Sequence, residues 1–303
     1  MHLPNHMIQG PVVPATNIIS TTIVAIAAIY AFKSERKPSA AGFAGVAAFI
    51  FALQMMNFPI QDGTSGHFVG AVLAVVLLGA PFGILAMSLV LVVQCFVFAD
   101  GGVSMLGANI LNMAIVGAFF GSIVNFLAFE NNERKRLQDY VLLAAGSWVA
   151  VVAASLILSV EMAFAGIGEF YKIAYAMVGT HMLIGIGELI ISVFTYAVIG
   201  AGFRNSSKKI VSYLPVGIAV VVGFLLSPFA SILPDGLDKV ADKFGIMPVE
   251  LPTFVTPLAD YSFPFVQNEM FSTAIAGLIG VIFTFITVWV VGKLLIGKRG
   301  VRY

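Results

Sequence analysis

The side chains best suited to metal chemistry in this sequence are its four histidines, His2, His6, His67 and His181. The α-amine of Met1, the amide nitrogen of residue 2 and the imidazole of His2 are neighbouring nitrogens that can chelate one metal ion. A second imidazole, that of His67, would complete a ring of four nitrogen donors. Because planar nitrogen donors favour nickel(II) or copper(II), this pattern predicts a site for a divalent transition metal.

Binding of this kind depends on protonation and on an intact first residue. The amine and the imidazoles must be unprotonated and the amide must lose its proton, so we expect binding to weaken at acid pH. The bulky His2 disfavours removal of the initiator, so we expect the chain to begin Met1-His2. A secretory signal starts with positive charge, whereas the first basic residue here is Lys33, beyond the first apolar segment.

With Cys95 as its single cysteine, the chain can form neither an intramolecular disulfide nor a cysteine metal cluster.

A loop rich in turn-forming residues delivers His67. It runs from Asn57 to His67, and the glycines at 63 and 66 allow close backbone approach. The alternative interpretation is an ordinary turn in which a Thr or Ser caps a helix.

The composition places most of the exterior against lipid. Apolar residues make up 59% of the 303 positions, charged residues 10%, and the mean hydropathy is +1.00. Soluble domains carry about 25% charged residues. No basic patch interleaved with aromatic residues occurs, so nucleic-acid binding has no support. We therefore predict an all-α, polytopic membrane bundle.

Nine membrane-spanning helices are expected, a seven-helix core and two C-terminal spans. A helix that crosses a bilayer needs roughly 20 apolar residues. Suitable segments run near residues 12–32, 40–57, 105–129, 140–160, 174–202, 210–228 and 271–296. The apolar stretch 67–98 is broken at Gly79-Ala80-Pro81, and proline interrupts a helix, so we divide it into helices 67–79 and 82–98. The first is too short to span lipid alone and should be buried among other helices.

The distribution of basic residues orients the bundle. With nine crossings and the amino terminus outside, thirteen of the sixteen Lys and Arg residues lie in inner loops or in the cytoplasmic carboxyl tail. Only Lys172, Lys239 and Lys243 lie outside. The same topology places all four histidines at the outer side.

Glu188 lies seven residues after His181, two turns along one helical face. A carboxylate within a span is costly and is a functional candidate by default. We expect it beside the metal ligands, in contact with Asn109 or Asn112; the alternative is a carboxylate paired only for structure.

Several motifs in order resemble the CbiM/NikM family, the substrate-capturing membrane subunits of energy-coupling-factor importers of cobalt and nickel. They are Met1-His2, Asn57-Phe58-Pro59, Gly63-Thr64-Ser65-Gly66-His67, Phe98-Ala99-Asp100-Gly101-Gly102, Leu106-Gly107-Ala108-Asn109 and the stretch from His181 to Glu188. The resemblance covers roughly 1–205, which we expect to be the metal-capturing core. It implies that Met1, His2 and His67 hold the metal. We expect Asn57, Ser65, His181 and Glu188 to be neighbours of these ligands or extra ligands.

Two positions depart from the family pattern. His6 stands in a Pro4-Asn5-His6-Met7 stretch where the family commonly has Pro-Asp-Gly, and Asp62 stands where a small residue is common. His6 is an extra donor, a neighbour of the ligands or a neutral change. Asp62 would attract cations.

The segment 206–303 adds two spans around an outer loop, 229–270. Its Pro234-Asp235-Gly236-Leu237-Asp238 stretch resembles the auxiliary component often encoded with, or fused to, the capture subunit. That resemblance implies assistance in metal loading. From the residues alone, the loop is merely acidic.

Energy for import must come from other subunits. The segment from Gly292 to Arg299 has the glycine and lysine spacing of a phosphate-binding loop, but Arg299 replaces the Ser/Thr and no strand precedes it. The family resemblance implies a transmembrane coupling protein and two cytoplasmic ATPases, and an inner-membrane location.

Small residues recur every four positions at Ala40, Ala44, Ala48 and Ala52, a pattern that allows close helix contact. We interpret this stripe as the docking face for the coupling protein, with packing inside the subunit as the alternative.

Two other classes of protein remain as alternatives. A secondary transporter or channel would work without ATPases, but its spans would carry more ionisable residues than Glu188. A membrane metalloenzyme would use histidines and carboxylates for a catalytic zinc, but no His-Glu-x-x-His pattern occurs.

Overall fold

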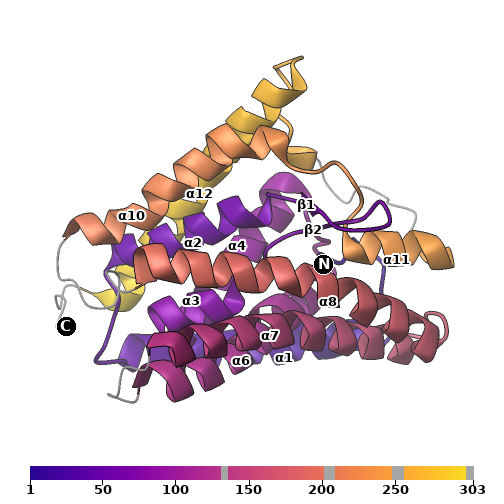
Figure 1. The fold of residues 1–303 in the computed structure, drawn as a ribbon, viewed down its shortest axis with the longest axis horizontal. Helices are drawn as coiled ribbons and strands as arrows, with labels where there is room; N and C mark the ends of the chain where they lie inside the picture. Colours follow the sequence, from indigo (N-terminus) through magenta and orange to yellow (C-terminus); the bar gives the residue numbers. More distant parts are fainter. Residues whose placement is uncertain (131–135, 201–208, 248–255, 298–303) are drawn as a thin grey trace.

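The computed structural model describes residues 1–130, 136–200, 209–247 and 256–297. The described chain is almost entirely helical (Figure 1). The helices are α1 (Val12–Lys33), α2 (Ala40–Gln54), α3 (Ala71–Leu78), α4 (Ala80–Phe98), α5 (Leu106–Asn109), α6 (Val116–Val124), α7 (Arg136–Phe164), α8 (Phe170–Thr195), α10 (Lys209–Val220), α11 (Gly236–Phe244) and α12 (Glu269–Ile296). Wider or tighter helical turns extend several of them: η1 (Ile110–Ile115), η2 (Asn125–Glu130), η3 (Tyr196–Gly200), η4 (Val221–Leu226) and η5 (Ser227–Phe229), with η6 (Ala259–Tyr261) standing alone.

The prediction of an all-helical fold is confirmed, and within the described residues six of the nine predicted spans are long enough to cross a membrane. They are Val12–Lys33, Ala80–Phe98, Leu106–Phe129, Leu137–Phe164, Phe170–Gly200 and Glu269–Ile296. The predicted spans 40–57 and 210–228 appear as shorter apolar helices, Ala40–Gln54 and Tyr213–Phe229. Many large apolar side chains on the outer faces of the long helices are exposed, as lipid contact requires.

The predicted break in the stretch 67–98 is present, and the helix before it is shorter than expected. Gly79 adopts a φ of 81°, and Pro81 lies in the first turn of α4, where its missing N–H costs no hydrogen bond. The helix does not begin at His67 as predicted. Residues 67–70 are not helical, and Gly70 has a left-handed φ of 84°, so α3 begins at Ala71, and all eight of its residues are buried.

Helix α2 lies inside the bundle, between α4 and the C-terminal pair α10 and α12 (Figure 1). Ala44, Ala48 and Ala52 are fully buried within the chain. Ala40 packs opposite Gly292 of α12. The interpretation of this stripe as a docking face for a partner is therefore wrong, because small side chains at these positions let the chain's own helices approach closely.

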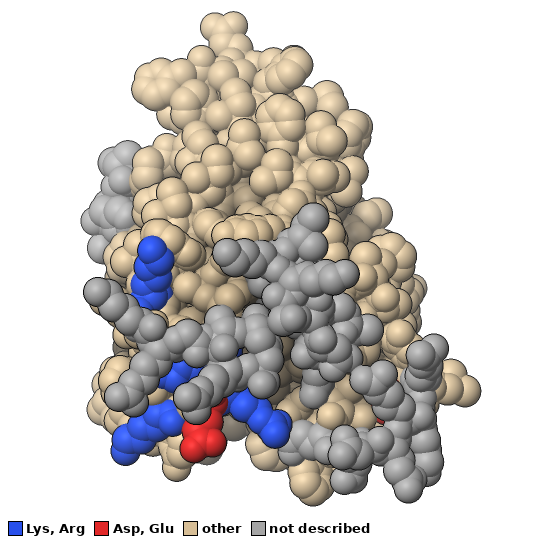
Figure 2. Space-filling view, turned by 90° about the vertical axis from the view of Figure 1, so that its left-hand side faces the viewer, with Lys and Arg blue, Asp and Glu red and all other residues tan. Residues whose placement is uncertain are grey.

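Basic residues gather at the end of the bundle where α12 ends. Figure 2 views this end and shows Lys and Arg side chains together. Lys33 ends α1, and the Nζ of Lys37 donates to the carbonyl of Leu295, 3.0 Å away near the end of α12. The α1–α2 turn and the end of α12 therefore share one face of the bundle.

The contact between α12 and η4 yields a stability prediction. A Cβ at Gly277 would collide with the carbonyl oxygen of Gly223, whereas one at Gly217 would meet nothing within 4 Å. We expect Gly277→Ala to destabilise the chain by about 1–3 kcal/mol, the usual cost of overpacking. Gly217→Ala adds the same methyl group at a free position and is the control. Thermal unfolding of both purified variants checks this, and equal midpoints would contradict the described packing.

Candidate metal centre

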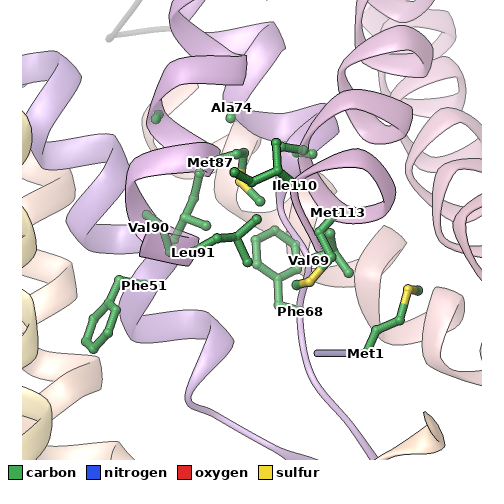
Figure 3. Close-up of a cluster of buried hydrophobic side chains, with 14 of the residues drawn as sticks. Met1, Phe51, Phe68, Val69, Ala74, Met87, Val90, Leu91, Ile110 and Met113 are labelled. Carbon is green, nitrogen blue, oxygen red and sulfur yellow. The ribbon is translucent and has the colours of Figure 1, made fainter. Parts of the chain in front are cut away.

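The first eight residues fold into the protein. Met1, Leu3, Met7 and Ile8 are buried and belong to the main apolar cluster. Figure 3 shows the Met1 side chain in this cluster with Phe68, Val69 and Met113. Burial of these apolar side chains therefore anchors the amino terminus, and the amine of Met1 has a defined position.

The loop between α4 and α5 holds the backbone of this segment. Leu3 donates its N–H to Oδ1 of Asn109 at 2.8 Å, and its carbonyl accepts from the N–H of Gly102 at 2.7 Å. A side chain at position 102 would collide with the backbone of Asn5, so only glycine fits there. The motif residues 98–109 thus position the chain terminus.

Glu188 positions the loop that carries His67. Its two carboxylate oxygens accept the N–H groups of Val69 at 2.6 Å and Gly70 at 2.8 Å. The predicted partners were wrong: Asn109 contacts Leu3, and Asn112 donates to Glu161. A buried carboxylate with two backbone donors ties helix α8 to the residues immediately after His67.

On the other side, His67 follows a short hairpin formed by β1 (Phe58–Pro59) and β2 (Ser65–Gly66). Its Nδ1 lies 3.1 Å from the carbonyl of Phe68. Since a carbonyl only accepts, Nδ1 carries the proton and Nε2 has a free lone pair.

That lone pair meets the amino terminus. The amine nitrogen of Met1 lies 2.7 Å from Nε2 of His67, and the rings of His2 and His67 stack at 5.1 Å. Two nitrogens that each lie about 2.0 Å from a metal at a right angle are about 2.8 Å apart. Among the described residues, no three His, Cys, Asp or Glu side chains are grouped closely enough to hold an ion. The Met1 amine is a further nitrogen donor beside His67.

Two carboxylates border these nitrogens. Asp100 Oδ1 lies 3.1 Å from Nδ1 of His2, and its Oδ2 accepts from the Tyr261 hydroxyl at 2.5 Å. Asp235 Oδ2 accepts from the amine of Met1 and lies 3.8 Å from Nε2 of His67.

Burial and these charges determine the protonation of the site. Burial, followed by the charge of the terminal amine, lowers the pKa values of His2 and His67 to about 3, so both are neutral near pH 7. Burial alone would raise the pKa of Asp235, but the terminal ammonium and His67 outweigh it and hold that pKa below its usual range. Burial, followed by the charge of Asp235, raises the pKa of Asp238 to about 7, and burial also raises the pKa of Asp100.

A cavity of about 610 Å³ lies beside these groups, between the N-terminal segment, the hairpin and the C-terminal region. Its polar lining includes His2, His67, Asp100, Asp235, Asp260 and Tyr261. The cavity gives a hydrated cation room beside the nitrogen donors.

The remaining predicted residues have other surroundings. His6 and Asp62 are exposed, and no described contact joins either side chain to the amine or to His67. His181 is buried, donates from Nδ1 to the carbonyl of Met177 at 2.7 Å, and lines a small cavity with Met1 and His67.

Two residues that were predicted beside the ligands make hydrogen bonds to the C-terminal region. Asn57 accepts from the N–H of Ser231, and Ser65 contacts residues 233 and 234.

Four residues beside the nitrogens were not predicted as site residues: Gln94, Asp100, Asp235 and Tyr261. For three of them the sequence contained a feature that could have indicated a place in the site. Gln94 is a lone amide in an apolar span, Asp100 lies in a family-like motif, and Asp235 precedes a helix. Nothing in the spacing of Tyr261 indicated its position.

The contacts of Glu188 yield a second prediction. Glutamine in its place offers one acceptor and one NH₂ group, so the N–H of Val69 or Gly70 is left facing a donor. We expect Glu188→Gln to lower the free energy of unfolding by about 1–3 kcal/mol. Glu169→Gln removes a carboxylate from an exposed pair with Lys172 and is the control, since such pairs contribute little. Denaturant unfolding in detergent measures both, and equal stabilities would contradict the anchoring role.

The lowered histidine pKa values yield a third prediction. In the unfolded chain His2 and His67 take up protons below about pH 6.5, whereas the folded chain excludes them until about pH 3. Their contribution to stability is therefore complete above pH 6.5 and is lost as the pH falls toward 3. Melting temperatures of wild type and His67→Gln between pH 7.5 and 5 check this: the wild type should lose more stability on acidification. Parallel curves would contradict it.

Comparison with known proteins adds independent evidence. Residues 2–205 match the CbiM family, described as a cobalt uptake substrate-specific transmembrane region, and residues 209–297 match the PDGLE domain. A putative fused nickel transport protein NikMN of Archaeoglobus fulgidus is 33% identical over 291 residues, covering 93% of this chain and 95% of that protein. A cobalt transport protein CbiM of Acetoanaerobium sticklandii is 31% identical over 159 residues, covering 50% of this chain and 63% of that protein.

A solved structure of a transition metal transporter shares the fold. It superposes with a TM-score of 0.57 at 25% identity, covering 70% of this chain and 96% of the other. The chain is therefore a multi-pass membrane protein of the CbiM family, a component for cobalt or nickel uptake that carries a C-terminal PDGLE domain.

Proposed function

We propose that this chain captures a nickel(II) or cobalt(II) ion with the amine of Met1, the amide nitrogen and imidazole of His2, and Nε2 of His67. The observation that carries the proposal is the 2.7 Å separation of the Met1 amine from Nε2 of His67. That separation suits adjacent donors on one ion. Both imidazoles are neutral at pH 7, as metal ligands must be.

The donor set suits nickel(II) when the four nitrogens are coplanar. Cobalt(II) accepts the same donors with added ligands. The names of the relatives include both nickel and cobalt transport proteins. We propose one capture site that serves this pair of ions.

Capture takes place at the extracytoplasmic face. Basic residues favour the cytoplasmic side of a membrane protein, and the end of the bundle with Lys33 and Lys37 is basic (Figure 2). Figure 1 draws the amino terminus and α11 away from that end.

Energy comes from partner subunits: a transmembrane coupling protein and two cytoplasmic ATPases of an energy-coupling-factor importer in the plasma membrane. The described part of the segment with phosphate-loop spacing, residues 292–297, is the helical end of α12 and its C-cap, whereas a phosphate-binding loop follows a strand and precedes a helix. The competing function is a secondary transporter or channel. Uptake by this chain in vesicles without ATPases would support that alternative, and uptake that requires ATPases and ATP supports the importer.

The capture site yields a fourth prediction. Adding one residue before Met1 moves the amine away from His67, and His67→Ala removes the other nitrogen. We expect each change to weaken nickel and cobalt binding by at least about 100-fold, since loss of an outer contact alone costs 10–100-fold. Isothermal titration and metal content of the purified chain measure this.

The control is His6→Ala, which removes an exposed imidazole from the same segment and should bind as wild type does. Helical circular dichroism establishes that all variants are folded. Unchanged affinity in the extended chain would rule out the amine as a ligand.

A further inference from the structure

The C-terminal region reaches the first nitrogen of the chain through one side chain. Asp235 lies 234 residues from Met1 in sequence, yet its Oδ2 accepts from the Met1 amine and lies 3.8 Å from Nε2 of His67. These are the two nitrogens that we propose as adjacent ligands. An ion bound to both would therefore lie next to this carboxylate oxygen.

The two oxygens of Asp235 have separate partners. Oδ1 accepts the N–H groups of Leu237 at 2.7 Å and Asp238 at 2.9 Å, and so caps the first turn of α11. Oδ2 accepts from the Met1 amine instead. One oxygen fixes the side chain, while the other is paired with the terminal ammonium, a cation whose place a metal ion can take.

The hairpin that delivers His67 also fixes the backbone around Asp235. Ser65 donates its N–H to the carbonyl of Pro234 at 2.8 Å and its hydroxyl to the carbonyl of Leu233 at 2.7 Å. On the other side, Gly236 packs so closely on α8 that a Cβ would lie 3.1 Å from the ring of His181. Asp235 and His67 are therefore held by one rigid set of contacts.

Charge balance favours an anion at this point. A divalent ion bound to one deprotonated amide and otherwise neutral nitrogens retains one positive charge. Burying an uncompensated charge is costly. Asp100, the other nearby carboxylate, faces Nδ1 of His2 and the Tyr261 hydroxyl instead of the amine. Asp235 is thus placed to neutralise the bound ion.

We propose that Oδ2 of Asp235 is an oxygen donor to the captured metal, so that the C-terminal region contributes a ligand to the site of the N-terminal region. This inference rests on the proposed function. When the metal enters, the Met1 amine and the amide nitrogen of His2 each lose one proton to solvent, and the metal replaces the ammonium group as the partner of Oδ2. The oxygen converts a plane of four nitrogens into a tetragonal set, which also suits nickel(II).

The test uses Asp235→Asn in the full-length chain. Asparagine keeps the capping oxygen and replaces Oδ2 with an NH₂ group that cannot bind a cation. Asp242→Asn, on the exposed face of the same helix, removes an equal charge and is the matched control. Titration with nickel chloride and cobalt chloride, and X-ray absorption of the nickel-loaded chain, are the measurements.

We expect Asp235→Asn to weaken binding by about 10–100-fold and to remove one oxygen scatterer from the nickel shell, while Asp242→Asn changes neither. Asp235→Ser, which also caps helices, should reproduce the loss and separates it from any effect on α11. Wild-type affinity and an unchanged nickel shell in Asp235→Asn would overturn the inference. If Asp235→Asn binds as wild type does while His67→Ala abolishes binding, the inference about Asp235 fails and the proposed function stands. Normal binding by His67→Ala contradicts the capture site itself.

Discussion

The contact between the terminal amine of Met1 and Nε2 of His67 is the interaction on which the candidate site depends. A charged amine is costly to bury, and here two partners compensate it, the imidazole lone pair and the Asp235 carboxylate. Because the donor is the terminus itself, its position depends on the fold of every residue that anchors it. The apolar side chains of Met1 and Leu3 provide that anchor in the bundle core.

Several distant parts of the chain meet at this contact. The α4–α5 loop holds the backbone of Leu3, Glu188 of α8 holds the residues after His67, and the start of α11 brings in Asp235. Each uses a buried or half-buried polar group whose partners are backbone atoms or the terminus. Leaving such groups without hydrogen-bond partners would raise the free energy of the folded state. The hydrogen bonds that stabilise the fold therefore also hold the Met1 nitrogen close to Nε2 of His67.

Local rules predicted much of the fold, whereas the surroundings of the site required tertiary information. The helical class and the break at Gly79 follow from hydropathy and from glycine and proline chemistry. The pairing of Met1 with His67 came from chelate chemistry and a family resemblance. The stripe that includes Ala44 was misassigned because small-residue spacing is the same for internal and external packing. Asp235 and Tyr261 were missed because both approach from a region whose docking no local pattern specifies.

The most direct test of the account is a structure of the nickel-loaded chain with anomalous scattering recorded at the nickel absorption edge. The account predicts one peak about 2 Å from both the Met1 nitrogen and Nε2 of His67. A peak elsewhere in the cavity, with the Met1 amine still paired to Asp235, would contradict it.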